Sequence, residues 1–335
     1  MGNQISKCVV WAVDPFAKDF IFQKTAVTAI KHLGAEKGLP VIPIYIWRET
    51  KVVGLQSGIS ALNLKRHHEL GQKRIDLLTE GEDVEFKSLQ IIAKPLISLR
   101  EGAEHLIQKS KKLNADMIVL STHARKGLEN WFVGSFAETL SFISDVPLLI
   151  AQPHWKLRST DRRVLFLTDF SQESYTAFEE LVETAKIRNW SITLFHQLKM
   201  EFYPTGEIAF AAWEVYQDTF REEEHQKRFL AHQLVEIGGR RGVKVEVLID
   251  TEHAGSVDTI ALNLLNSNHL MVALASRSTF LQRAFLGSTT RQLIRNSPVP
   301  VWVIHPNMEK NLEARRKLQA VSRDIHHSLK GDTHI

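Results

Sequence analysis

Two neighbouring segments combine small, hydroxyl-bearing and cationic residues in a way that suits phosphate binding. The first is the loop Ser121-Thr122-His123-Ala124-Arg125-Lys126-Gly127, and the second is Gly134-Ser135-Phe136, at the expected start of a helix. Small residues let backbone N–H groups approach a phosphate, and a helix N-terminus adds partial positive charge. Ser135 offers a hydroxyl, and Arg125 offers a guanidinium that pairs with phosphate oxygens. These segments indicate an anion site.

Catalytic and metal-binding signatures are missing from the sequence. It contains no G-x-x-x-x-G-K-[ST], H-E-x-x-H, C-x-x-C or G-x-S-x-G motif. The adjacent pairs His67-His68 and His326-His327 would diverge on a helix, which is poor geometry for binding one metal ion. We therefore expect a protein that is not an enzyme and that has no metal site of its own.

The elements that must position these residues occur twice. The apolar run Val9–Val13, which ends in Asp14, is echoed by Val164–Thr168, which ends in Asp169. Further along, Gly134-Ser135 is echoed by Gly287-Ser288, and Val146-Pro147 is echoed by Val299-Pro300. Landmarks that recur in the same order predict two copies of one domain.

Short Val-, Ile- and Leu-rich runs alternate with helical periodicity in both copies, which predicts βαβ units and a parallel sheet. Strands are expected at 7–13, 39–47, 84–92, 115–121 and 146–152, and again at 163–168, 190–198, 243–250, 269–275 and 299–304. The domains are expected at 1–153 and 163–307, with a linker at 154–162.

Two further segments carry helical signals. A long helix is expected from Glu207 to Ile237, ended by a C-cap at Gly238-Gly239, and its aromatic stripe faces either the core or a protein partner. Residues 308–335 have an amphipathic pattern and predict a helical tail. We expect that tail to dock on the protein's own surface, and a partner helix or a membrane surface are the alternatives.

Composition excludes several classes of protein. The 335 residues include 42 Lys and Arg against 38 Asp and Glu, a net charge of +4, without a long basic run, so no nucleic-acid partner is expected. No apolar stretch reaches the length of a membrane span, and no signal peptide opens the chain. The single cysteine, Cys8, is expected to be buried and reduced. The expected compartment is the cytoplasm.

The sequence resembles the universal stress protein family in its tandem two-domain form. The resemblance is carried by Ala115–Leu128, Gly134–Glu138 and Asp145–Leu149, and in the second copy by Thr168–Ser171 and Leu286–Thr289. It implies two tandem Rossmann-like α/β domains of the HUP/Usp type, each a five-stranded parallel sheet flanked by helices. It also implies that the last strands of the two copies meet as an intramolecular version of the family's dimer.

The resemblance further implies a nucleotide site. ATP, where bound, places its adenosine near the aspartate and the second strand and its phosphates on the glycine loop, with Mg²⁺ accompanying it. The implied binding residues are Asp14, Ile46, Ser121, Ala124, Arg125, Gly134, Ser135 and Phe136 in the first copy, and Asp169, Gly287, Ser288 and Thr289 in the second.

Departures from the family signature G-x2-G-x9-G-[ST] are expected to weaken nucleotide binding in the second copy more than in the first. Ser121 and Ala124 replace the first two glycines, while Gly134-Ser135 is intact. In the second copy the two glycine positions fall on Leu274 and Arg277 or, if one residue is deleted, on Ala275 and Ser278. Gln197 of the second copy also occupies the position that Ile46 has in the first. We therefore expect nucleotide in the first copy more than in the second.

The expected function is that of a cytoplasmic stress-response factor that binds ATP or another adenine nucleotide. Two alternatives stay open: an interaction or scaffold protein whose pockets are degenerate, and a slow ATPase. The sequence does not specify a protein partner. Assembly of several chains into a homo-oligomer, in addition to the pairing of the two copies within one chain, stays open. No membrane partner is expected.

Overall fold

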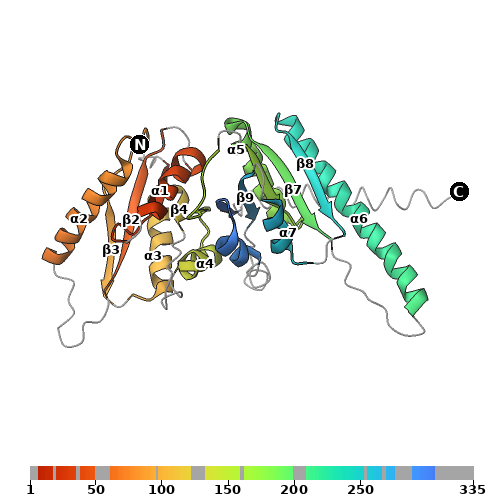
Figure 1. The fold of residues 1–335 in the computed structure, drawn as a ribbon, viewed down its shortest axis with the longest axis horizontal. Coiled ribbons are helices and arrows are strands. Elements are labelled where there is room, and N and C mark those ends of the chain that lie inside the picture. The colour runs from red at the N-terminus through yellow and green to blue at the C-terminus, as the bar shows by residue number, and fades with distance from the viewer. Residues whose placement is uncertain are drawn as a thin grey trace, which may run out of the picture.

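The structure is a computed structural model of the 335-residue chain. It describes residues 7–17, 20–34, 38–49, 61–95, 97–121, 133–158, 162–198, 209–252, 255–265, 269–275 and 289–305. Their strands form one ten-stranded sheet in the order β3-β2-β1-β4-β5-β10-β9-β6-β7-β8. Figure 1 shows its two halves side by side, with helices on both faces.

The N-terminal copy contributes five parallel strands: β1 (Cys8–Ala12), β2 (Val41–Glu49), β3 (Gln90–Pro95), β4 (Ala115–Ser121) and β5 (Leu148–Ala151). Their order is β3-β2-β1-β4-β5, so the strand order reverses between β1 and β4. In such a sheet the crevice at the carboxyl ends of the strands beside the reversal is where ligands bind.

The C-terminal copy repeats this topology with β6 (Arg163–Leu167), β7 (Ser191–Gln197), β8 (Val245–Asp250), β9 (His269–Ala275) and β10 (Val301–Ile304). Its neighbouring strands are parallel as well. The tandem α/β arrangement of two five-stranded parallel sheets is therefore confirmed.

The last strands of the two copies pair with each other. β5 and β10 are antiparallel, with Cα partners Ile150↔Val301, Leu149↔Trp302 and Leu148↔Val303. This is the meeting of last strands that the family resemblance implies. One hydrophobic core cluster includes buried side chains from both copies, such as Trp11 and Phe166.

Helices connect the strands. The N-terminal copy has α1 (Phe20–Ala29), which continues as the π-helical turn η1 (Ile30–Gly34), α2 (Ala61–Thr79), α3 (Leu99–Lys112) and α4 (Val133–Ile143). The C-terminal copy has α5 (Gln172–Arg188), α6 (Ala209–Arg240), α7 (Val257–Leu264) and a helix at 289–296. Right-handed crossovers place α1 and α2 on one face and α3 and α4 on the other, in agreement with the contacts α1–α2 and α3–α4.

The strand expected at 84–92 is displaced in the structure. Its ladder with β2 begins only at Ile44↔Gln90, while Phe86 forms an isolated bridge with Val41. Gln90 follows Phe86 by four positions, whereas Ile44 follows Val41 by only three, so one extra residue interrupts the pairing. The prediction that the strand starts at residue 84 was therefore wrong.

The predicted end of the long helix was also wrong. α6 continues through Gly238 and Gly239 to Arg240, and the chain turns at Gly242, whose φ of +79° favours glycine. A Cβ on Gly238 would lie 2.3 Å from Val245 Cγ2. Gly238 therefore permits close packing of α6 on β8 and is not a helix cap.

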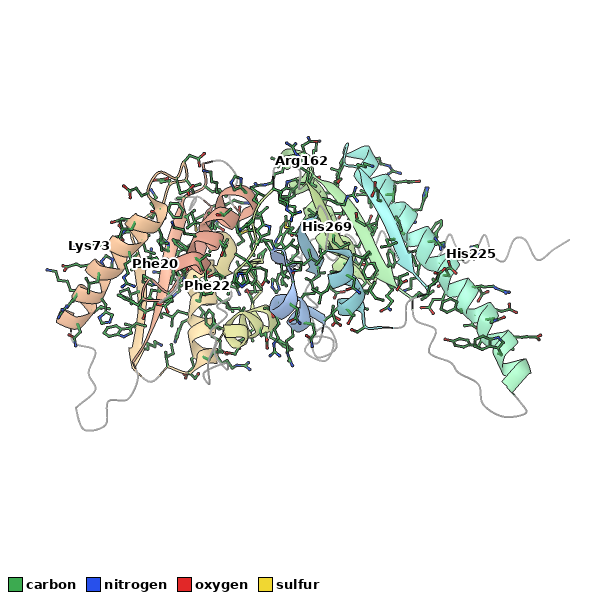
Figure 2. The ribbon with its side chains drawn as sticks, in the orientation of Figure 1. Phe20, Phe22, Lys73, Arg162, His225 and His269 are labelled. Carbon is green, nitrogen blue, oxygen red and sulfur yellow. The ribbon has the colours of Figure 1, made fainter. Side chains whose placement is uncertain are left out.

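α6 is only partly core-facing. Ala231 and Leu234 are buried near its C-terminal end, whereas Val215 is 68% and Phe229 46% exposed. Figure 1 shows the helix extending past β8, and Figure 2 places the exposed His225 on this part of it. The C-terminal part of α6 thus packs on the sheet, and its N-terminal part does not.

Other expectations fall partly outside the described residues. The tail at 308–335 lies wholly outside them, as do residues 159–161 of the linker. The domain boundaries stay predictions. No helix in the described part of the chain is long and apolar enough to cross a membrane. Cys8 is buried with a free thiol, as expected.

Substituting the two adjacent glycines of α6 tests their different roles. Gly238→Ala should destabilise the protein by about 1–3 kcal/mol, because its Cβ overlaps Val245. Gly239→Ala is the matched control, since nothing lies within 4 Å of its added Cβ; it should leave stability unchanged or raise it by up to about 1 kcal/mol. Urea unfolding of both variants measures the difference, and equal effects would contradict the packing role.

Candidate functional site

Asp14 lies two residues after the end of β1, at the carboxyl edge of the N-terminal sheet. Its Oδ1 accepts a hydrogen bond from the Phe16 backbone N–H at 3.0 Å, and its backbone oxygen accepts one from Gln23 Nε2 at 3.3 Å. The preceding Val13 N–H donates to Ile44 O in β2 at 3.0 Å. These bonds fix the chain at the point where the strand order reverses.

Two serines lie on the segments that flank the predicted phosphate loop. Ser121 ends β4, and Ser135 lies in the first turn of α4 beside Gly134. The Oγ atoms of both serines are buried, and neither has a hydrogen-bond partner within the described part of the chain. Buried hydroxyls normally have partners, so this pair indicates a place where a polar ligand would be accommodated.

The first turn of α4 is tied to the rest of that helix. Ser135 O accepts a hydrogen bond from Thr139 Oγ1 at 2.5 Å, and Phe136 packs against the core. The helix therefore presents the N-terminal N–H groups that suit an anion. Ala124 and Arg125 lie outside the described residues, so the structure does not place them.

Ile46 provides an apolar contact on the α3 face of β2. A Cβ on Gly102 of α3 would lie 3.4 Å from Ile46 Cγ2, so the helix backbone approaches this side chain closely. Ile46 pairs with Ile92 of β3. The second strand of the N-terminal copy is thus apolar on this face near its carboxyl end.

An aromatic and cationic stack lies beside Asp14, on the face of the sheet opposite to Ile46. The Phe16 ring lies 5.4 Å from the Tyr45 ring, and the Arg74 guanidinium lies 5.7 Å from the Phe16 ring centre. Burial raises the pKa of the Tyr45 phenol, and the negative charge of Asp14 raises it further, so Tyr45 stays protonated. This stack could not be predicted from the sequence, because it forms between residues far apart in the chain.

The C-terminal copy builds a similar stack from different residues. The Phe170 ring lies 4.9 Å from the His196 ring, and Lys227 Nζ lies 5.9 Å from the Phe170 ring centre. His196 Nδ1 lies 2.8 Å from Thr168 O. Burial lowers the pKa of His196, so the ring is neutral near pH 7 with Nδ1–H as the donor to Thr168.

Asp169, the counterpart of Asp14, is engaged more fully. Its Oδ1 accepts hydrogen bonds from Ser174 Oγ at 2.6 Å and from the Ser171 N–H at 2.9 Å. Phe170 takes a left-handed conformation with φ of +58°, which is uncommon for a bulky residue. Local contacts in the C-terminal copy thus already occupy an oxygen of this carboxylate.

Strand register shows how the two crevices differ. The pairing of Val9 with Val41 in the first copy is equivalent to the pairing of Val164 with Ile192 in the second. Five residues further along the second strand, Gln197 therefore occupies the position of Ile46. Asp250 then takes the place of Ile92, and Gln197 Nε2 donates to Gly255 O at 3.1 Å. The C-terminal crevice is therefore more polar.

Register also decides between the two alignments of the second loop. The pairing of Ala12 with Leu120 in the first copy is equivalent to the pairing of Leu167 with Leu274 in the second. The next residue, Ala275, therefore occupies the position of Ser121. The alignment with a deletion is correct at this position, and the C-terminal copy lacks the strand-end hydroxyl. Gly287 and Ser288 lie outside the described residues, and Thr289 begins the described part of the last helix.

The comparisons with known proteins agree with this architecture. The model of the universal stress protein family matches residues 19–152 and 161–305, so the chain belongs to the universal stress protein family. Its two matches make it a tandem, two-domain member. A comparison with curated proteins finds no match.

Solved structures share the fold over most of the chain. A universal stress protein from Archaeoglobus fulgidus DSM 4304 superposes with a TM-score of 0.60 at 18% identity, covering 90% of this chain and 97% of that one. A protein of unknown function from Pseudomonas aeruginosa PAO1 gives a TM-score of 0.51 at 12% identity, covering 93% and 98%.

The buried histidine predicts a pH dependence of stability. His196 has a pKa below its usual 6.5 in the folded protein, so the unfolded chain binds a proton first as pH falls below about 6.5. Folding stability should therefore decrease with acidification from that point, by up to about 1.4 kcal/mol per pH unit for this group.

Urea unfolding of wild type and His196→Gln at pH 7.5, 6.5 and 5.5 isolates this contribution. Burial also lowers the pKa of His32, so the informative quantity is the difference between the two proteins. The variant should lose less stability on acidification, and parallel losses would show that His196 contributes nothing.

Proposed function

We propose that the protein is a cytoplasmic stress-response factor that binds an adenine nucleotide in its N-terminal copy and acts without turnover. The observation that carries this proposal is the pair of buried, unpartnered hydroxyls of Ser121 and Ser135 within the described residues. They lie at the carboxyl end of β4 and in the first turn of α4, the positions that suit phosphate oxygens.

In this proposal the phosphates bind at the first turn of α4. Backbone N–H groups near Gly134, together with the Ser121 and Ser135 hydroxyls, donate to phosphate oxygens, and Arg125 adds positive charge. Ala124 keeps the loop small. The adenosine lies near Asp14 and against Ile46, whose apolar surface suits a base. ATP is the proposed nucleotide, and Mg²⁺, when bound with it, neutralises part of the phosphate charge.

The C-terminal copy is proposed as the weaker site. Asp169 Oδ1 already accepts two hydrogen bonds, Gln197 and Asp250 replace apolar residues, and Ala275 lacks the hydroxyl of Ser121. Residues Gly287, Ser288 and Thr289 retain the helix-start sequence. We therefore expect one nucleotide per chain at moderate concentrations.

A second candidate function is protein interaction through α6. The exposed Val215 lies on the part of α6 that does not pack on the sheet, and Phe229 is exposed on the packed part, two residues before the buried Ala231. These exposed apolar side chains support a role in contacting a protein partner. This role is compatible with nucleotide binding, because it uses a different surface.

Calorimetry with ATP and Mg²⁺ tests the proposed site. Ser135→Ala should weaken binding about tenfold or more, because it removes a hydrogen bond to a charged group. Gly134→Val should weaken it further by placing a branched side chain at the start of α4.

Ser288→Ala in the C-terminal copy is the matched control and should change affinity less than twofold. Absence of both heat and a thermal shift at millimolar nucleotide would contradict the proposal and favour the interaction protein. Equal loss in Ser135→Ala and Ser288→Ala would contradict the assignment to the N-terminal copy.

A further inference from the structure

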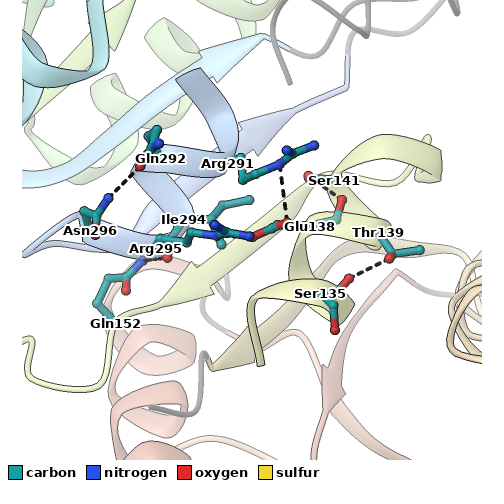
Figure 3. Close-up of polar contacts among 10 residues, drawn as sticks. All are labelled: Ser135, Glu138, Thr139, Ser141, Gln152, Arg291, Gln292, Ile294, Arg295 and Asn296. Carbon is teal, nitrogen blue, oxygen red and sulfur yellow. Dashed lines mark hydrogen bonds and ion pairs between the residues drawn. The ribbon is translucent and has the colours of Figure 1, made fainter. Parts of the chain in front are cut away.

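A charged contact links the helices that follow the two predicted phosphate loops. Glu138 of α4 lies across the junction of the copies from the helix at 289–296 (Figure 3). Its carboxylate lies 2.6 Å from Arg295 Nε and 3.4 Å from Arg291 Nε. The Glu138 side chain is only 14% exposed, whereas the Arg291 and Arg295 side chains are 46% and 53% exposed, so salt screens this cluster in part.

The two sides of this contact are equivalent positions of the repeat with opposite charge. Glu138 lies four residues after Gly134, and Arg291 lies four residues after Gly287. A junction between two identical copies would place like charges against each other here, which is unfavourable. The duplicated chain instead has an acid in one copy and bases in the other.

Glu138 also lies close to the proposed phosphate position. It follows Ser135 by three residues, which is about 4.5 Å along the helix axis. An anion at the first turn of α4 is repelled by the negative charge of Glu138, and the two arginines of the C-terminal copy offset that repulsion. The charge felt at the N-terminal site thus depends on side chains from both copies.

We propose that the C-terminal copy regulates anion binding in the N-terminal copy through Glu138, by holding Arg291 and Arg295 against it. This inference rests on the proposed nucleotide site and adds how that site is tuned. Glu138 acts through the charge near the start of α4 and does not contact the nucleotide. The C-terminal copy thereby has a role even where its own crevice is empty.

Calorimetric titration with ATP and Mg²⁺ at about 50 mM salt tests this regulation. Glu138→Gln should tighten binding about threefold, because it removes a repulsive charge. The double variant Arg291→Gln/Arg295→Gln should weaken binding about three- to tenfold, and Arg295→Lys, which keeps the charge, should bind as wild type does. At about 1 M salt all these differences should become smaller.

Two controls separate charge from structure. Glu236→Gln and Arg240→Gln change a pair at the C-terminal end of α6 and should each alter affinity less than twofold. Thermal unfolding identifies variants that have lost stability. A merely structural contact would weaken binding in Glu138→Gln as well, so tighter binding in this variant is the diagnostic result.

The inference is overturned if Glu138→Gln and the arginine double variant both weaken binding, or if neither changes it. It is also overturned if the effects are as large at about 1 M salt as at about 50 mM salt. A wild-type protein that binds no nucleotide would instead contradict the proposed function itself, and the inference would fall with it.

Discussion

The antiparallel pairing of β5 with β10 is the contact on which the rest of the molecule depends. It joins two parallel five-stranded sheets into one, and it covers in each copy a strand edge that would otherwise present unpaired backbone groups. Since α4 precedes β5 and the helix at 289–296 precedes β10, this pairing also brings together the helices that begin near the two predicted phosphate loops. Glu138, Arg291 and Arg295 meet for this reason.

The two copies share the hydrogen bonds that fix their strands and helices, and they differ in the polarity of the side chains at their crevices. Both fix the end of the first strand by an N–H bond to the second strand, from Val13 to Ile44 and from Thr168 to Phe195. Both end their last helix with a serine whose hydroxyl bonds to a valine two residues later, Ser144 to Val146 and Ser297 to Val299. Polarity at the crevices differs because Gln197 and Asp250 replace Ile46 and Ile92.

Most of the fold and part of the candidate site could be predicted from the sequence. Short apolar runs identify buried parallel strands, and Ala115–Ser121 and His269–Ala275 form as expected. The start of β3 was missed because an extra residue after Phe86 interrupts pairing that composition does not reveal. The end of α6 was missed because Gly238 is required by contact with Val245, which is a tertiary reason. The Phe16–Tyr45–Arg74 stack and the Glu138 contact join distant residues, and one sequence carries no signal for such pairs.

Of the two homologous crevices, we propose that the N-terminal one holds the nucleotide. Native mass spectrometry of the full chain, with ATP and Mg²⁺ at increasing concentration, measures this stoichiometry directly. We expect a single nucleotide to bind and saturate before any second one appears. A chain that binds none, or that fills two sites in parallel, would contradict a single N-terminal site.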